Sequence, residues 1–147
     1  MSLEQWLSYG QLIRHEPSAQ EISGLLAIVE RDIVASRLPG LPADWRLNIA
    51  HNAALQAATA ALAAAGYRAT RDAHHYTIIQ SLEHTIGLDP SIIDRMNKLH
   101  KKRNFASYTS AGAISDKEAD EMHKLAMDIR RRVLEWLNAD RPDLLDE

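Results

Sequence analysis

Cysteine is absent from this chain of 147 residues, and aromatic residues make up only 5% of it, with a single phenylalanine. The absence of cysteine excludes disulfide bonds and thiolate-ligated metal sites. The low aromatic content argues against a β-rich core, because strands favour aromatic and β-branched side chains. These two absences point away from disulfide-bonded and β-rich classes of protein.

Long hydrophobic runs are also missing. The uncharged stretch 47–67 contains two asparagines, a histidine, a glutamine and a threonine among many alanines, so it is too polar for a bilayer core. Residues 1–5 lack the basic start and the apolar run of a signal peptide. We therefore expect a cytoplasmic protein with no membrane partner.

The overall composition is that of a soluble globular protein. Hydrophobic residues make up 46% of the chain and charged residues 25%, with a net charge of −3. A slightly acidic chain has no general attraction for nucleic acid, so DNA is not an expected partner and any RNA contact must come from a local patch. The length suits one domain with a sizeable core, and we expect a single domain over residues 1–147.

Hydrophobic residues recur with the helical period along almost the whole chain. The capping-box pattern occurs twice, as Ser18-x-x-Glu21 and as Ser115-x-x-Glu118, and Gly66 is a suitable helix stop. We predict no strands and an all-α fold, an up-and-down four-helix bundle with additional short helices. The predicted segments are helices over residues 3–14, 18–38, 43–65, 72–85, 89–104 and 115–138, a loop over 105–112, and an acidic, frayed tail after 138.

The predicted helix over residues 43–65 is unusual, because alanines cover one broad face of it. Small side chains let neighbouring helices approach closely. An uncharged polar stripe from Asn48 to Thr59 lies on the other side, where a solvated helix normally carries lysine and glutamate. We expect another helix or a second subunit to cover this stripe in part, the alternative being a plain exposed face.

Arg103 falls on the hydrophobic face of the predicted helix over residues 89–104. At about 100° per residue, its position lies within the stripe that runs from Ile92 through Met96 to Leu99. An unpaired buried charge is very costly. Arg103 therefore either pairs with a carboxylate of a neighbouring helix or contributes to a ligand site.

Lys98, Lys101 and Lys102 fall on the opposite side of the same predicted helix. They form either a solvated face or a set of phosphate contacts beside the arginine. The histidines of the chain show no convergent ligand spacing, so neither a metal nor another cofactor is expected.

Taken together, several features resemble a HEPN domain, a family named for nucleotide binding in higher eukaryotes and prokaryotes. The resemblance extends from about Glu21 to Leu137. The features are the helical plan, the alanine-rich helix ending in Ala64-Ala65-Gly66-Tyr67, the His74-His75 pair and the Arg103-Asn104 dipeptide.

The family's sharpest motif is an arginine, often followed by Asn, Asp or His, then four to six residues and a histidine. Arg103 and Asn104 match its first half, but Tyr108 stands where the histidine would fall. The resemblance implies that two copies of this motif meet across a dimer in the family's ribonucleases. There the arginine stabilises the phosphate, and the histidine assists proton transfer from the 2′-hydroxyl. A tyrosine, with a pKa near 10, is a poor base at neutral pH, although it donates hydrogen bonds and stacks on bases. His100 is the alternative proton-transfer group.

Two function classes follow from this resemblance. The first is a non-catalytic or weakly active homodimeric module that binds a nucleotide, an RNA or a partner protein. The resemblance implies a nucleotidyltransferase-type partner, sometimes in a toxin–antitoxin pair. The alternative is a metal-independent endoribonuclease with an altered Arg-x4-Tyr centre at a dimer interface. The candidate ligand-binding residues are Arg103, Asn104, Tyr108 and Lys102, and the candidate catalytic residues are Arg103, Asn104, Tyr108 and His100.

Overall fold

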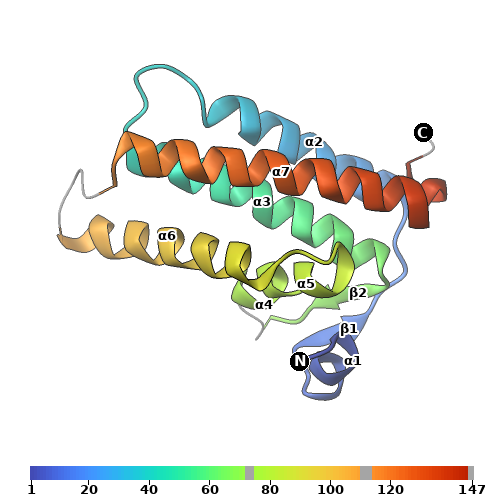
Figure 1. The fold of residues 1–147 in the computed structure, drawn as a ribbon. Helices are drawn as coiled ribbons and strands as arrows, with labels where there is room; N and C mark the ends of the chain where they lie inside the picture. Colours follow the sequence, from blue (N-terminus) through green and yellow to red (C-terminus); the bar gives the residue numbers. More distant parts are fainter. Residues whose placement is uncertain (72–74, 110–113, 146–147) are drawn as a thin grey trace.

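The chain is mainly helical in its structure, a computed structural model that describes residues 1–71, 75–109 and 114–145. Side chains are described for all of these residues except 105–109. The helical class predicted from the sequence is confirmed (Figure 1). The helices are α1 (Leu3–Ser8), α2 (Ala19–Ala35), α3 (Ala43–Ala64), α4 (His75–Gln80), α5 (Leu82–Thr85), α6 (Pro90–Thr109) and α7 (Asp116–Asp140), and the strands are β1 (Leu12–Arg14) and β2 (Tyr67–Ala69).

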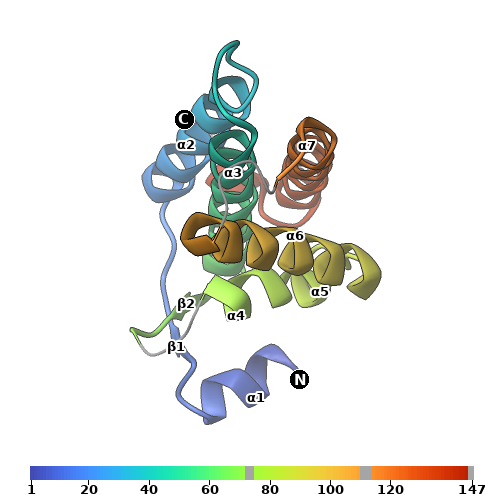
Figure 2. The ribbon, with the colours of Figure 1, turned by 90° about the vertical axis from the view of Figure 1, so that its left-hand side faces the viewer.

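Helix α3 lies at the centre of the molecule, between α2 and α7 and above α6 in the end view of Figure 2. Alanines are buried around most of its circumference, and they let α2 and α7 pack closely against its backbone. Its polar stripe is partly covered by α2, where Asn52 Nδ2 donates to the buried carboxylate of Asp32 at 2.7 Å. Another helix of the same chain thus provides the expected cover at Asn52.

Local sequence signals set several of the helix ends. Ser115 and Glu118 form the predicted capping box at the start of α7. At the start of α2, Ser18 accepts from the backbone N–H of Glu21, as predicted, but the Glu21 carboxylate contacts His15 Nε2 at 2.8 Å instead of closing the box. After α3, Gly66 has a φ of 98°, the left-handed conformation expected beyond a helix C-terminus.

The predicted helix over residues 3–14 is wrong beyond Ser8. Gly10 has a φ of 77°, which ends the helix and turns the chain. The chain then forms β1, which pairs antiparallel with β2 and places Leu12 opposite Ala69. The expectation of no strands is therefore also wrong. Because the two strands are far apart in sequence, the local pattern of the first residues does not reveal this pairing.

Two other predicted helices have different limits. Helix α2 ends at Ala35 instead of near residue 38. The helix expected over residues 72–85 is divided into α4 and α5 at Ser81, whose hydroxyl donates to the carbonyl of Ile78 at 2.6 Å. Such side-chain bonds to the preceding turn compete with regular helix geometry. Its first three positions lie outside the described residues.

The loop predicted over residues 105–112 is wrong up to Thr109, because α6 continues to that residue, and the rest of it lies outside the described part of the chain. The tail expected to fray is structured over its described residues, which end at Leu145. Helix α7 continues to Asp140, and a 3-10 turn follows at residues 142–144. Leu144 is buried there, and Arg141 Nη1 donates to the carbonyl of Ala64 at 2.8 Å. One apolar side chain and one cation thus hold the tail against the bundle.

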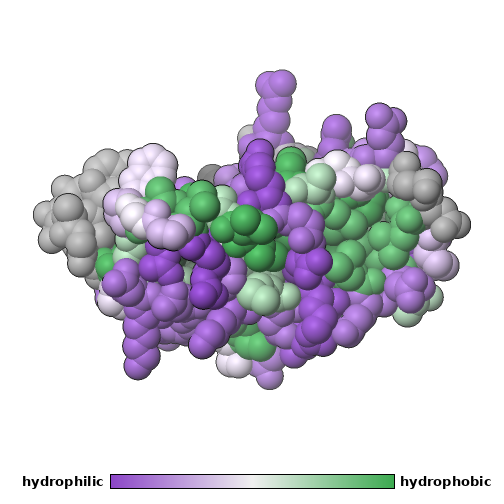
Figure 3. All heavy atoms as spheres, turned by 90° about the horizontal axis from the view of Figure 1, so that it is seen from above, coloured by the Kyte–Doolittle hydropathy of each residue, from purple (hydrophilic) through white to green (hydrophobic). Residues whose placement is uncertain are grey.

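The outer faces of α2 and α7 are mixed in polarity. Seen from above Figure 1, hydrophobic side chains gather in patches between hydrophilic ones (Figure 3). Exposed apolar side chains on these two helices include Val34 and Met127. In the described part of the chain, no helix has both the length and the apolar character needed to cross a membrane.

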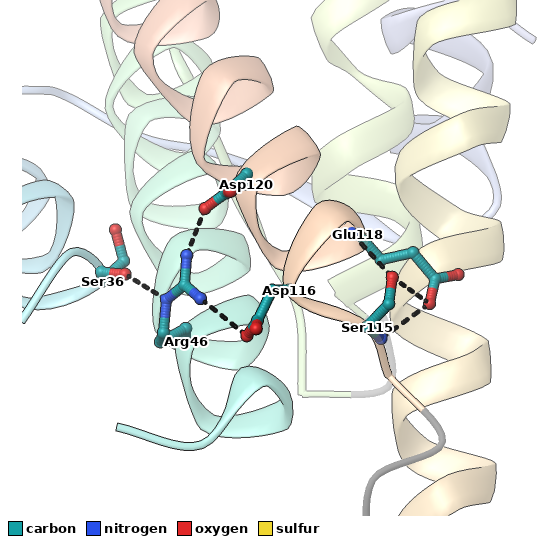
Figure 4. Close-up of polar contacts among 6 residues, drawn as sticks. All are labelled: Ser36, Arg46, Ser115, Asp116, Glu118 and Asp120. Carbon is teal, nitrogen blue, oxygen red and sulfur yellow. Dashed lines mark hydrogen bonds and ion pairs between the residues drawn. The ribbon is translucent and has the colours of Figure 1, made fainter. Parts of the chain in front are cut away.

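One arginine joins the end of α2 to the start of α7 (Figure 4). Arg46, on the first turns of α3, donates to the carbonyl of Ser36 at 3.3 Å and to Asp116 at 3.2 Å, and it also pairs with Asp120. Behind it, the Ser36 hydroxyl and His123 Nδ1 lie 2.7 Å apart, and both residues are buried. These contacts hold together the end of the bundle where α2 ends and α7 begins. The candidate site lies on another side of α3.

Candidate functional site

A cavity of about 450 Å³ opens between α3, α4 and α6. This volume is within the range of typical small-molecule sites, roughly 300–1,000 Å³. Its lining combines imidazole, amide, ammonium, carboxylate and phenol groups around a single aliphatic side chain. The lining residues are His51 from α3, His75, Tyr76 and Ile79 from α4, and Asp94, Asn97, Lys98, His100, Lys101 and Asn104 from α6.

Two histidines from different helices stack in the wall of this cavity. The rings of His51 and His100 are parallel within 1°, and their centroids are 3.7 Å apart. His51 is buried at the centre of α3, whereas His100 is half-buried on α6. The stack therefore connects the central helix to the helix that carries most of the cavity's polar groups.

The surroundings of both stacked rings favour the neutral form. Burial, followed by the neighbouring His100 and His75, lowers the pKa of His51 to about 3. Burial also lowers the pKa of His100, with further contributions from the charge of Arg103 and from His75. A neutral imidazole offers one N–H donor and one acceptor nitrogen. Lys98 and Lys101 bring ammonium groups to the same cavity.

Helix α6 has three sides, and each carries a different kind of residue. Ile93, Met96 and Leu99 are buried in the core. Asn97, Lys101 and Asn104 recur at helical spacing and line the cavity. The remaining side faces α7, where acidic residues pair with the cations of α6.

Lys102, a predicted ligand-binding residue, belongs to this last side and is not among the described residues that line the cavity. Its ammonium lies 2.8 Å from a carboxylate oxygen of Glu118 on α7. Arg95 makes the equivalent contact two turns earlier, where its Nε lies 2.6 Å from Glu121. The reason is helical geometry: residues seven apart share a side of the helix, and this side faces α7 rather than the cavity.

The other predicted site residues have different outcomes. Asn104 and His100 both line the cavity. Arg103 is half-buried, on the side of α6 that carries the core residues, and it is not among the described residues lining the cavity. The charge of Arg103 nevertheless affects the cavity, because it contributes to the lowered pKa of His100.

Tyr108 lies on α6 rather than in a loop, and its side chain is outside the described residues. Positions five residues apart on one helix are about 140° apart around its axis. Residues 103 and 108 are therefore on different sides of α6. A loop over residues 105–112 would not have fixed their directions relative to each other.

Several cavity residues were not predicted from the sequence. Tyr76 and Asn97 carried no motif, although the spacing of Asn97, Lys101 and Asn104 along α6 is a usable signal, since positions i, i+4 and i+7 share a side. His51 is brought to α6 only by the packing of two helices. His75, the second residue of the predicted histidine pair, is exposed at the cavity, while His74 lies outside the described residues.

Metal binding has no support in the arrangement of these side chains. Within the described residues, no three histidine or acidic side chains converge as ligands for an ion.

Comparison with known proteins finds no family model, no curated protein and no solved structure that matches this chain. The chemistry of the cavity is therefore the basis on which a function can be assigned.

Proposed function

We propose that the chain is a HEPN-like helical module whose cavity between α3, α4 and α6 binds a nucleotide. One observation carries the proposal: ammonium, amide, neutral imidazole and phenol groups line a single open space of about 450 Å³. These are the groups that a phosphate, a sugar and a base each require. The resemblance of Arg103-Asn104 to the family motif supports the same assignment.

Lys98 and Lys101 are the groups assigned to the phosphate. Both are exposed at the cavity on α6, and Asp94 is the single carboxylate among the lining residues described. The lysines thus outnumber the acid, and the lining has a net positive charge. An ammonium group binds phosphate as a point charge at the end of a flexible stem.

Amides and an aromatic ring are the groups assigned to the base. Asn97 and Asn104 are two turns apart on the same side of α6, and each amide offers both a donor and an acceptor. The Tyr76 side chain is 58% exposed, and Gln80 Nε2 donates to its hydroxyl oxygen at 2.6 Å, which restrains the ring. An exposed, restrained ring is a stacking surface for a base.

Isothermal titration calorimetry with adenosine 5′-monophosphate (AMP) tests the proposal. We expect AMP to bind and adenosine to bind far more weakly. Lys98→Gln and Lys101→Gln should each weaken AMP binding roughly tenfold, because each removes a charged hydrogen bond. Lys102→Gln is the matched control on the same helix, and it should leave binding unchanged because Lys102 faces Glu118. Equal loss in all three variants, or no binding of AMP, contradicts the proposal.

A second candidate function is metal-independent cleavage of RNA, and one observation favours it. His100 presents a neutral imidazole in the same cavity as two lysines. A neutral imidazole can accept a proton from a 2′-hydroxyl, and lysines can stabilise the charge on the attacked phosphate. His100 would then take the role of the missing motif histidine.

Incubation of RNA with the purified protein in EDTA tests this candidate. Cleavage that is lost in His100→Gln and in Arg103→Ala, with Lys102→Gln retaining it, would support an enzyme. Intact RNA with the unaltered protein, under conditions in which AMP binds, would exclude cleavage and leave the binding function.

A further inference from the structure

A second cavity, of about 420 Å³, adjoins the proposed nucleotide site. The two cavities share Tyr76 and Asp94 in their linings, so they are neighbours beside α6, and the two together are called the groove. Beyond the shared residues, the second cavity is lined by Trp6 from α1 and by Glu83 and His84 from α5. The indole of Trp6 meets the ring of His84 edge to face, with centroids 5.5 Å apart, which joins α1 to this wall.

The groove has opposite charges at its two ends. Lys98 and Lys101 line one end, whereas Glu83 lines the other and Asp94 lies between them. Along α6, residue 101 is two turns, or about 10 Å, beyond residue 94. Tyr76 is shared by both halves and lies between the cationic and the anionic end. A ligand in this groove therefore meets ammonium groups, then an aromatic ring, then carboxylates.

We propose that the groove selects nucleotides that carry all their phosphate at the 5′ end and leave the ribose hydroxyls free. This inference rests on the proposed nucleotide site. With the 5′-phosphate on Lys98 and Lys101 and the base against Tyr76, the 2′- and 3′-hydroxyls lie toward Asp94 and Glu83. Ionised carboxylates accept hydrogen bonds from hydroxyl groups and repel a second phosphate. The groove therefore favours a free nucleotide over an internal segment of an RNA chain, whose next phosphate would fall at the anionic end.

The proposal predicts an unusual order of affinities. Adenosine 3′,5′-bisphosphate carries more negative charge than AMP, so a merely cationic surface would bind it more tightly. The groove should do the opposite and bind the bisphosphate at least about tenfold more weakly than AMP, since a like charge near the carboxylates opposes binding. Removing both hydroxyls, in 2′,3′-dideoxyadenosine 5′-monophosphate, should also weaken binding several-fold, because two hydrogen bonds to carboxylates are lost.

Calorimetric titrations of the full chain with these three probes, at one fixed salt concentration, provide the test. Glu83→Gln removes one charge from the anionic end, so it should raise affinity for the bisphosphate several-fold. It should weaken AMP binding only slightly, because the glutamine amide oxygen still accepts a hydrogen bond from a ribose hydroxyl. Glu16→Gln is the matched control, because Glu16 is exposed and lies outside the described linings of both cavities. It should change neither affinity.

The outcomes separate this inference from the function on which it rests. If AMP does not bind, the nucleotide site itself is wrong. If AMP binds but the bisphosphate binds equally well or more tightly, the nucleotide site stands and the selectivity is overturned. If the bisphosphate binds weakly and Glu83→Gln does not restore it, the carboxylate is not the cause and the inference is likewise overturned.

Discussion

His51 and His100 lie face to face, with their ring centroids 3.7 Å apart and their planes within 1° of parallel. Two protonated rings at this separation would repel each other, and the burial of His51 adds a desolvation cost to any charge placed there. The folded chain therefore favours the neutral form of the pair. This preference couples the integrity of the cavity wall to pH.

We expect the free energy of unfolding to fall in mild acid because of His51. Its pKa is lowered from 6.5 to about 3 in the folded chain, so below pH 6.5 the unfolded chain binds a proton that the folded chain does not. Its contribution to stability is complete above pH 6.5 and declines as the pH falls towards 3. Between pH 7 and pH 5 the loss from this group is about 2 kcal/mol. Urea unfolding at several pH values measures it.

The matched variant for this prediction is His51→Gln, which removes the titrating ring from the core. The change in unfolding free energy between pH 7 and pH 5 should be smaller in the variant by about 2 kcal/mol. His100 and His123, whose pKa values are also lowered by burial, remain in both proteins and account for a residual slope. An identical slope in the two proteins would contradict the assignment to His51.

Ser36→Ala should destabilise the chain by about 1–3 kcal/mol. The substitution leaves the buried Nδ1 of His123 without the hydroxyl that lies 2.7 Å from it. The exposed Ser23 on α2 supplies the control, since Ser23→Ala should change stability by less than about 0.5 kcal/mol. Thermal unfolding measures both variants, and equal midpoints would show that the Ser36 contact is not stabilising.

Asn52→Ala should cost about 1.5–3 kcal/mol, because it removes a hydrogen bond to the buried carboxylate of Asp32. Arg31 Nε still donates to Asp32 at 2.9 Å, so the carboxylate keeps one cation. Asn48→Ala, one turn earlier on the same half-buried stripe, should cost less. Denaturant unfolding compares the two, and a reversed order would show that the Asp32 contact is unimportant.

Two glycines should respond in opposite directions to alanine. Gly66 has a φ of 98°, so Gly66→Ala should cost about 1–2 kcal/mol of backbone strain. Gly24 is exposed within α2, and a Cβ there meets nothing within 4 Å, so Gly24→Ala should stabilise by about 0.5–1 kcal/mol. A stabilised Gly66→Ala protein in thermal unfolding would contradict the structure at that turn.

The long helices were predictable because their signals are local. The alanine pattern of α3, the Ser115–Glu118 cap of α7 and the stop at Gly66 each depend on neighbouring residues alone. The pairing of β1 with β2 depends on a contact between distant segments, and hydrophobic periodicity does not record it. The burial of Leu144 has the same origin, since the acidic composition of the tail does not reveal where it docks.

The candidate site was only partly predictable for a related reason. The position of Arg103 on the buried side of α6 follows from helical spacing, and Asn104 beside it does reach the cavity. Lys102 pairs with Glu118, and the sequence of α6 alone does not reveal this contact because the acid lies on another helix. His51 and Tyr76 come to the cavity from α3 and α4, so only the packing of three helices shows that they belong together.

The composition of α3 also determines how the molecule can be probed. Systematic truncation to alanine is the usual survey of a protein core, yet much of the central helix already consists of that residue. Alanine substitutions can remove few side-chain atoms from α3, so such a survey would report small changes in stability for this buried helix. Enlargement is the informative experiment: a valine at Ala54 or Ala57 must push a neighbouring helix away, at a cost of roughly 1–3 kcal/mol. Tolerance to added volume, rather than to lost volume, is the property that locates the centre of this protein.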